Sequence, residues 1–424
     1  MTEDFLHYLW QQRLFLQDGI RTACGETVIV ERTGVRNSNA GPDFTDARVK
    51  IGDTLWVGCV EIHINSSDWE KHGHHHDEAY NNVVLHAVYH HDATAYNASG
   101  IKIPVLELHF DNRYYENYLQ LADNRETIAC KDNIGMVDEF CRATWLDRLL
   151  VERLEQKSKA ILQTYTVTGN NWEETLYRHL ARNFGFGLNA LPFESLAQSL
   201  PYNILLKHRD NLQQLEALLF GQAGMLTDEH PEDGYYSDLR KEYHFLRQKY
   251  SLTPGEEFLW KFLRLRPVNF PTVRIAQFSA LIYRNEHLFA GIVGTNDKQW
   301  EQIFEIEASP YWDTHYVFGK SSPERRKIFG KTAYYTVMIN TIIPFLFVYG
   351  KERNKEDYCI CAMELLENLP PEHNAILSRW KTLGFANDNA FVSQALLQLK
   401  NEYCAAKRCL HCAFGNVIVK RTKG

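Results

Sequence analysis

Two acidic residues and a histidine mark the ends of two alternating segments near the N-terminus. Asp43 opens the first segment, and Glu61 and His63 close the second, within GPDFTDARVKIGDTLWVGCVEIH at residues 41–63. Apolar and polar residues alternate in both, which predicts two strands joined by a turn at Gly52. Side chains two residues apart on a strand share a face, so we expect Glu61 and His63 to project together. A hairpin would bring Asp43 near Glu61.

These residue types favour a site for a hard divalent cation. Two carboxylates at the ends of strands can hold Mg²⁺ (or Mn²⁺), which prefers oxygen ligands and keeps several of its waters. An ion held there would polarise a phosphoryl oxygen and convert a bound water into a nucleophile. We therefore predict Asp43, Glu61 and His63 as catalytic residues. The alternative is an ordinary hairpin with a surface aspartate and glutamate.

The same stretch resembles the PD-(D/E)XK nuclease superfamily over residues 1–110. Pro42-Asp43 stands for the PD, and Glu61-Ile62-His63 stands for the (D/E)XK. The resemblance implies a restriction-endonuclease-like domain and a nuclease (a hydrolase), with magnesium held by Asp43, Glu61 and the carbonyl of Ile62. The chain departs from the family at His63, where a lysine is usual. An imidazole titrates near ~6.5 and an ammonium near ~10.4, so His63 would be a neutral base and a weaker fixed charge.

The elements expected around this site are one helix and several strands. Helical spacing of apolar residues predicts a first helix over 3–16, with Thr2 as a candidate cap. Strands are expected at 27–31, 82–89 and 103–110. Helix, strand, strand, strand is the order with which the core of that superfamily begins.

A histidine-rich loop follows His63 and offers a second chemistry. It contains His72, His74, His75 and His76 within INSSDWEKHGHHHDEAY. Histidine is the commonest transition-metal ligand, so a zinc-dependent hydrolase is one interpretation, although a helical H-E-x-x-H is missing. A second interpretation makes His72, His74 and His76 substrate-binding residues that contact phosphate. A third is a solvated loop.

The C-terminus carries a third candidate site, in which Cys404, Cys409 and Cys412 form C-x4-C-x2-C. Thiolates this close can bind zinc or an iron–sulfur cluster at a second, structural site. The sequence leaves the fourth ligand open among His411, Cys359, Cys361, Cys130 and Cys141. The alternative is a set of buried free thiols.

The bulk composition narrows the class of protein. The chain has 424 residues, 45% hydrophobic and 23% charged, with a net charge of −7. Because the chain is acidic overall, binding to nucleic acid would need a local basic groove. We expect no membrane span, because no run of about 18 apolar residues is present. The acidic N-terminus is unlike a signal peptide, and nine cysteines, an odd number, argue against a disulfide scaffold, so a cytoplasmic protein is expected.

Two domains are expected: a nuclease-like domain at 1–125, and an α-helical domain at 126–424 that ends in the cysteine motif. The fold class is α+β, with a small mixed sheet followed by a mostly helical region. Arg264, Arg266 and Arg274 surround a proline-containing bend in the helical part. Arginine suits phosphate recognition, so these are candidate substrate contacts. The alternative is that they pair with acidic neighbours or face water.

Nearly the whole chain is similar to a bacterial protein family of unknown function. The similarity is carried by NAGPDFTDA, VEIHINSSDW, LARNFGF, EALLFGQAG, RLRPVNFP and YCAAKRCLHCAFG. The leading hypothesis is a metal-dependent phosphodiesterase that acts on nucleic acid, DNA included. The alternatives are a catalytically inactive nuclease-like module that binds nucleic acid or a protein, and the zinc hydrolase built on the histidine-rich loop.

Overall fold

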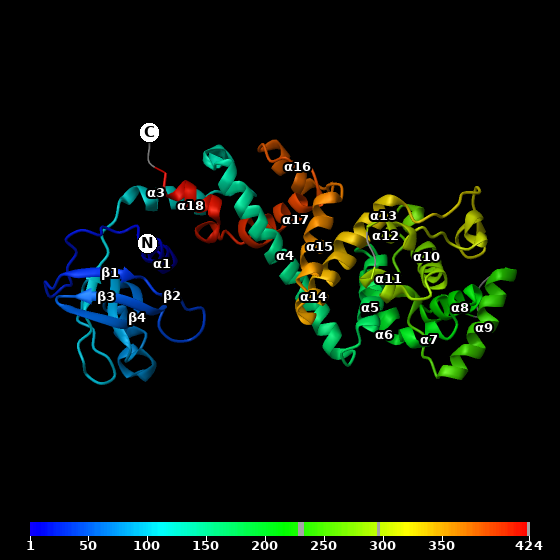
Figure 1. Ribbon diagram of the computed structural model, residues 1–424, viewed down its shortest axis with the longest axis horizontal. Coiled ribbons are helices and arrows are strands. Elements are labelled where there is room, and N and C mark those ends of the chain that lie inside the picture. Colours follow the sequence, from blue (N-terminus) through cyan, green and yellow to red (C-terminus); the bar gives the residue numbers. More distant parts are fainter. Residues whose placement is uncertain (228–232, 295–296, 422–424) are drawn as a thin grey trace. The chain divides into compact units, whose positions relative to one another are not determined.

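The structure is a computed structural model that describes residues 1–227, 233–294 and 297–421 (Figure 1). The chain forms two compact units. One combines Met1–Trp145 with Leu399–Gly424, and the other is Leu146–Gln398. The predicted arrangement, a mixed sheet at the N-terminus followed by a mostly helical region, is confirmed.

A mixed six-stranded sheet forms the centre of the first unit, in the order β1-β3-β4-β5-β6, with β2 paired to β3 (Figure 1). The strands are β1 (Val28–Arg32), β2 (Val35–Arg36), β3 (Phe44–Ile51), β4 (Thr54–Asn65), β5 (Val83–His90) and β6 (Val105–Glu107). Strands β1, β3 and β4 pair antiparallel, and β4, β5 and β6 pair parallel. The predicted strands are present, although the last is only three residues long.

Strands β3 and β4 form the predicted hairpin. Ile51 pairs with Thr54, so Gly52 and Asp53 make a two-residue turn. Gly52 has a φ of +58°, which glycine adopts at little cost and which a tight hairpin turn of this kind requires. The hairpin places Asp43, just before β3, beside the second half of β4.

Helix α1 (Glu3–Gln11) packs against β4. The Thr2 hydroxyl accepts a hydrogen bond from the Phe5 N–H at 3.3 Å, which confirms the predicted cap. The helix ends earlier than predicted because Arg13 takes a left-handed φ of 53° and Phe15 then forms a β-bridge with Phe110.

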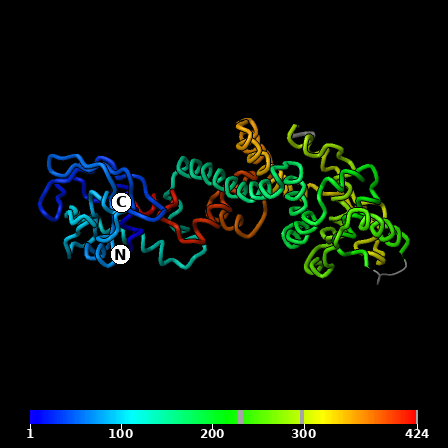
Figure 2. Tube along the Cα trace, turned by 90° about the horizontal axis from the view of Figure 1, so that it is seen from below, coloured from blue at the N-terminus to red at the C-terminus, as the bar shows by residue number. Residues whose placement is uncertain are grey.

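Short helices complete the first unit. They are α2 (Asp68–Lys71), η1 (His74–His76), η2 (Glu78–Tyr80), α3 (Asn112–Ala122), η3 (Lys131–Met136), η8 (Leu399–Cys404), η9 (Cys409–His411) and α18 (Ala413–Val419). The C-terminal segment, red in Figure 2, belongs to this unit although it lies at the far end of the sequence.

This division differs from the predicted domains 1–125 and 126–424. The amide of Asn117 donates hydrogen bonds to the carbonyls of Val419 and Arg421 at 3.1 and 3.2 Å. These bonds, with the packing of α18 on α3, hold the cysteine-rich C-terminus in the N-terminal unit. Contacts between segments so distant in the sequence leave no signal in the composition, so the boundary that the sequence predicts near residue 125 does not take them into account.

In the residues that the structure describes, the second unit is helical apart from one small hairpin of β7 (His315–Val317) and β8 (Lys320–Ser321). The boundary between the units falls within α4 (Glu139–Val167). The remaining longer elements are α5 (Trp172–Phe184), α6 (Ala190–Ser199), α7 (Tyr202–Leu206), α8 (Leu212–Gln222), α9 (Gly234–Tyr250), α10 (Pro271–Arg284), α11 (Leu288–Val293), α12 (Asp297–Ile303), α13 (Lys331–Val337), η7 (Met338–Ile342), α14 (Ile343–Arg353), α15 (Glu356–Asn368), α16 (Ala375–Thr382) and α17 (Ala390–Gln398). Short turns η4 (Glu257–Leu259), η5 (Pro267–Asn269) and η6 (Pro310–Thr314) connect some of these helices.

One helical run of this unit, Lys331–Arg353, is long and apolar enough to cross a membrane by length and composition. The sequence itself predicts no membrane span, because it has no run of about 18 apolar residues. In the structure 78% of its most apolar 18-residue stretch is buried inside the protein, as is typical of a core helix.

Candidate metal centre in the N-terminal unit

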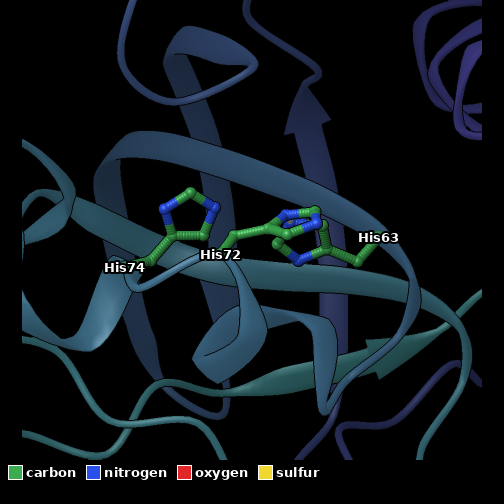
Figure 3. Close-up of side chains that lie close together, drawn as sticks. All are labelled: His63, His72 and His74. Atoms are coloured by element: carbon green, nitrogen blue, oxygen red, sulfur yellow. Dashed lines mark hydrogen bonds between the residues drawn. The ribbon is translucent and has the colours of Figure 1, made fainter.

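Three histidines from two separate elements converge beside the sheet. His63 lies on β4, and His72 and His74 lie in the loop that follows it (Figure 3). One ring nitrogen of each lies within 4.8 Å of the others. Nε2 of His63 and Nδ1 of His72 are 3.1 Å apart. This spacing is that of ligands that share one ion.

The local sequence explains how the loop returns to β4. The Asp68 carboxylate accepts a hydrogen bond from the Asn65 N–H at 3.0 Å, where β4 ends, and α2 begins there. Trp69 is fully buried, and its indole N–H donates to the Tyr96 carbonyl at 2.8 Å. Gly73, with a φ of +78°, then turns the chain between His72 and His74.

Glu61 adds a carboxylate to the three histidines. Its Oε1 lies 3.4 Å from Nε2 of His74 and 3.6 Å from Nε2 of His63. Nε2 of His74 is buried with this carboxylate oxygen beside it, so both atoms could bind one ion. Burial raises the pKa of the Glu61 carboxyl above its ordinary value, an effect that the nearby His74 opposes. A cation in the cluster would favour the ionised form.

His86 on β5 holds His63 from the other side of its ring. Nδ1 of His63 and Nε2 of His86 are 2.9 Å apart. When Nδ1 of His63 carries the proton and donates it to His86, Nε2 is left with a free lone pair for a metal. Burial is the main cause that lowers the pKa of His63, to about 4, and it lowers that of His86 as well. His63 is therefore neutral at pH 7, as a ligand must be.

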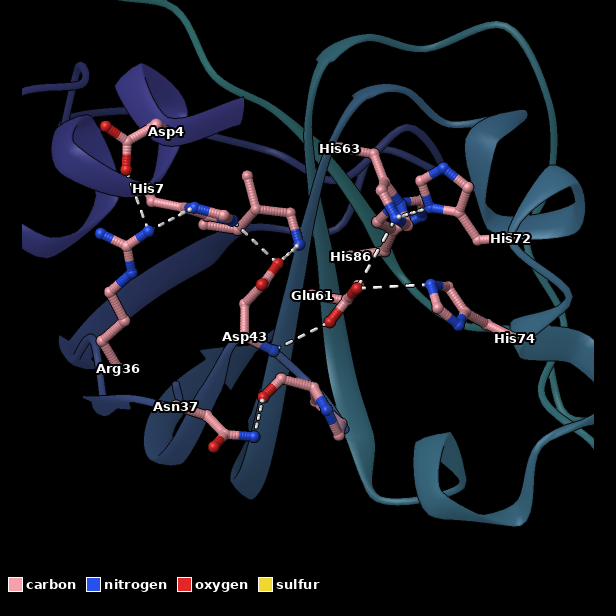
Figure 4. Close-up of polar contacts among 12 residues, drawn as sticks. Asp4, His7, Arg36, Asn37, Asp43, Glu61, His63, His72, His74 and His86 are labelled. Carbon is pink, nitrogen blue, oxygen red and sulfur yellow. Dashed lines mark hydrogen bonds and ion pairs between the residues drawn. The ribbon is translucent and has the colours of Figure 1, made fainter. Parts of the chain in front are cut away.

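Asp43 meets Glu61, but through its backbone. The Asp43 N–H donates to Oε2 of Glu61 at 2.9 Å (Figure 4). The Asp43 carboxylate accepts a hydrogen bond from the Ile62 N–H at 3.0 Å and lies 3.0 Å from Nε2 of His7. The predicted magnesium site used the Ile62 carbonyl and both carboxylates. In the structure Asp43 faces the Ile62 N–H and α1, whereas Oε1 of Glu61 faces the histidines.

The remaining predicted substrate-binding residues lie outside this cluster. His76 is exposed, and its ring packs on that of His75 instead of joining the cluster. Arg264 and Arg266 are exposed in the second unit. Arg274 is buried, donates to Gln277 and Asn269, and its guanidinium lies over the ring of Phe186. These contacts give Arg274 a structural role, since its guanidinium is already used inside the protein.

Two residues of the site were missed by the sequence analysis. His7 lies in the first helix and His86 in a strand that was predicted only as buried and apolar. The signal for His86 was present, because an ionisable residue inside the apolar run NVVLHAVY must find a polar partner when it is buried. The predicted cysteines, Cys404, Cys409 and Cys412, lie in the same unit and gather with Cys130.

Searches of curated proteins and of solved structures found no significant match. A family model described as "Protein of unknown function (DUF2851)" matches residues 3–375, which is most of the chain. The match takes in the histidine cluster, Glu61, Asp43 and His86, and it ends before the three C-terminal cysteines. The chain therefore belongs to the DUF2851 family.

Proposed function

We propose that this protein is a metal-dependent hydrolase of phosphodiesters, with its metal held by His63, His72 and His74 beside Glu61. The observation that carries the proposal is the convergence of the three imidazoles, with donor nitrogens within 4.8 Å of one another. The proposal thus combines two predictions from the sequence. One is a metal site on the histidine-rich loop, and the other is a catalytic site at Glu61 and His63.

The donor set favours zinc over magnesium. Imidazole nitrogens suit Zn²⁺ and its transition-metal neighbours, whereas Mg²⁺ prefers oxygen ligands only. Bonds of ~2.0–2.1 Å in tetrahedral geometry place ligand atoms roughly 3.4 Å apart. The separations of 3.1, 3.4 and 3.6 Å among these atoms agree with that spacing. Magnesium or manganese at Asp43 and Glu61 becomes the second choice.

Each residue would have a defined task. His63, oriented by His86, would act as a ligand and no longer as the free base expected from its place in the motif. Glu61 would add a fourth ligand through Oε1, while the Asp43 N–H holds its other oxygen, so a bound water would make the ion five-coordinate. His72 is exposed, so water and substrate would approach from its side. A zinc ion there would lower the pKa of a bound water to about 7 and polarise the phosphoryl oxygen.

Nucleic acid remains the proposed substrate, through the resemblance to the PD-(D/E)XK superfamily. The order α1, β1, β3, β4 follows the helix, strand, strand, strand order of that core, and the hairpin places Asp43 against Glu61. The restriction-endonuclease-like type of fold is part of this proposal.

One observation favours a second candidate, a nuclease-like module that binds nucleic acid or a protein without cleaving it. The Asp43 carboxylate is held by the Ile62 N–H and His7, so it does not face an ion together with Glu61. In that case the histidine cluster would hold a structural metal.

A metal analysis combined with a cleavage assay tests the proposal. The full chain would be assayed with Zn²⁺, Mn²⁺ and Mg²⁺ on single- and double-stranded DNA and RNA and on a small phosphodiester. His63→Ala and His74→Ala should abolish both stoichiometric zinc and cleavage. His76→Ala is the matched control from the same loop and should change neither. Zinc binding without cleavage of any substrate would favour the binding module, and cleavage that survives in His63→Ala and His74→Ala would exclude this centre.

A further inference from the structure

Two segments of the second unit concentrate positive charge in a chain that is acidic overall. They are residues 258–274 and 313–331, which together contain nine lysines and arginines and two acidic residues, whereas the whole chain has a net charge of −7. The first segment contains no acidic residue at all. Such a local excess of cations suits a polyanion, because contacts with phosphates supply much of the affinity of a protein for nucleic acid.

The fold places the two segments side by side. Helix α10 packs against β7, and the Thr272 hydroxyl donates a hydrogen bond to the Tyr316 carbonyl at 2.5 Å. Aromatic rings extend the contact, since the ring centroid of Phe270 lies 5.2 Å from that of Phe262 and 6.3 Å from that of Tyr316. Segments that are separate in the sequence are therefore joined in the structure.

Five cationic side chains of these segments are exposed and form no ion pair with another described residue. They are Lys261, Arg264, Arg266, Lys320 and Arg325, which we call the basic surface. Arg326 differs from them, because its guanidinium pairs with the Glu307 carboxylate. Arginine binds phosphate oxygens in a bidentate manner, so the basic surface offers donors of the right kind to a phosphate backbone.

Two further cations of the same segments are buried. Arg274 is 6% exposed and Lys327 is 3% exposed, and neither forms an ion pair within the described part of the chain. The Arg274 guanidinium lies over the ring of Phe186, and its Nε has no hydrogen-bond partner. The Lys327 ammonium donates to the carbonyls of Asp313 and Arg325 at 3.1 and 2.7 Å. Charges in such surroundings are weakly screened, so both add to the positive potential that an anion would meet.

Aromatic and apolar side chains accompany the cations. Phe258 is 79% exposed and Leu263 is 85% exposed, and the rings of Phe262, Phe270 and Tyr316 are partly exposed. Proteins that bind single-stranded nucleic acid combine such groups, because unpaired bases stack on the rings while the phosphates meet the cations. In a duplex the faces of the bases are hidden, so the rings favour a single strand.

We propose that the basic surface binds the phosphate backbone of a single-stranded nucleic acid, with unpaired bases against Phe258 and the neighbouring rings. The inference takes its class of partner from the proposed function and adds the place at which the strand is held. Acidic lipid is the other polyanion that cations and exposed apolar groups can meet. Binding at a membrane surface usually employs an amphipathic helix, whereas residues 258–266 contain only the short turn η4, so the strand is the better match.

Fluorescence anisotropy of the full chain with a labelled single strand, tested as DNA and as RNA in the presence of EDTA, measures the binding. We expect the logarithm of the affinity to fall with that of the salt concentration with a slope of roughly −3.5, about −0.7 for each of the five cations. Arg264→Gln with Arg266→Gln should make the slope shallower by about 1.4. Phe258→Ala should weaken binding at least about fivefold. The matched control, Lys159→Gln with Lys381→Gln on α4 and α16, removes two exposed cations and should leave both quantities unchanged.

A second measurement maps the surface without any substitution. Acetylation of lysines in the folded wild-type chain, read by mass spectrometry, should be slower at Lys261 and Lys320 when the strand is bound, and equally fast at Lys159. Equal acetylation of the bound and free protein at all three sites would overturn the proposal. A salt dependence that Arg264→Gln with Arg266→Gln leaves unchanged would also overturn it.

The remaining outcomes separate this inference from its rivals and from the proposed function. Binding to vesicles of anionic lipid, with no binding to nucleic acid, would assign the surface to a membrane. A duplex bound as tightly as the single strand would overturn the choice of a single strand. Binding as predicted, without cleavage of any substrate, would support this inference and remove the phosphodiesterase. Cleavage whose KM is unchanged in the Arg264→Gln, Arg266→Gln protein would overturn this inference alone.

Discussion

Nδ1 of His63 and Nε2 of His86 are 2.9 Å apart on the neighbouring parallel strands β4 and β5. The register that pairs Glu61 with His86 and His63 with Val88 sets this contact. It directs the opposite nitrogen of His63 toward His72 and Glu61. The sheet thus orients the one histidine of the cluster that does not come from the loop.

His86 should affect metal binding although it is not a ligand. Replacing it by phenylalanine removes the partner of His63, and such second contacts are worth about 10–100-fold in metal affinity. His86→Gln, which keeps an acceptor, should restore part of the loss. Zinc titration measures the metal affinity of both variants. The control is His90→Phe, at the exposed end of the same strand. Equal affinities in wild type and His86→Phe would mean that the His63–His86 contact is unimportant to the centre.

Substitutions of Glu61 and of Asp43 should have different effects on metal binding and on stability. Glu61→Gln removes a ligand charge, so we expect metal affinity to fall and cleavage to drop at least 10²-fold. Asp43→Asn weakens the bonds to Ile62 and His7, so we expect a stability loss of about 1–3 kcal/mol with zinc still bound. Urea denaturation and zinc titration separate the two effects. Loss of metal in Asp43→Asn would instead support the magnesium site predicted from the sequence.

His63 should make the metal-free protein sensitive to acid. Its pKa is about 4 when folded and about 6.5 when unfolded, so the unfolded state binds more protons between these values. The free energy of unfolding should fall as pH drops from about 6.5 to about 4, by up to about 3 kcal/mol, and then level off. Urea denaturation across this range measures the slope. His63→Gln should make the slope smaller, the rest being due to His86, and His76→Gln should leave it unchanged, whereas identical slopes in all three proteins would contradict this assignment.

Trp69 should hold the loop that carries His72 and His74. Its ring packs against those of His74 and His86, with centroids 5.3 and 5.2 Å away. Trp69→Phe removes the hydrogen bond to the Tyr96 carbonyl and leaves unfilled volume, so we expect a loss of about 1–3 kcal/mol. Zinc affinity should fall as well, because the loop ligands are less well held. The control is Trp56→Phe, because Trp56 lies on the exposed part of β4. This variant should match wild type in both thermal unfolding and zinc titration.

Local features of the first unit could be predicted from the sequence because they depend on neighbours in the chain. Alternation with period two defines the two strands of the hairpin and puts Glu61 and His63 on one face. Thr2 caps its helix through a bond to Phe5, three residues away. The chemistry of Asp43, Glu61, His63 and the loop histidines was also visible, since residue type alone determines which atoms can bind a metal.

Only the tertiary structure decided how these groups combine. The choice of His72 and His74 over His76 depends on how Trp69 anchors the loop, and the role of His86 depends on the parallel pairing of β4 and β5. Asp43 was expected to face an ion, but α1 brings His7 to its carboxylate. Cys130 meets the C-terminal cysteines because α18 packs on η3. Each of these contacts joins segments that are far apart in the sequence. Periodic patterns describe only neighbouring residues, so the contacts are determined by burial and packing of the whole unit.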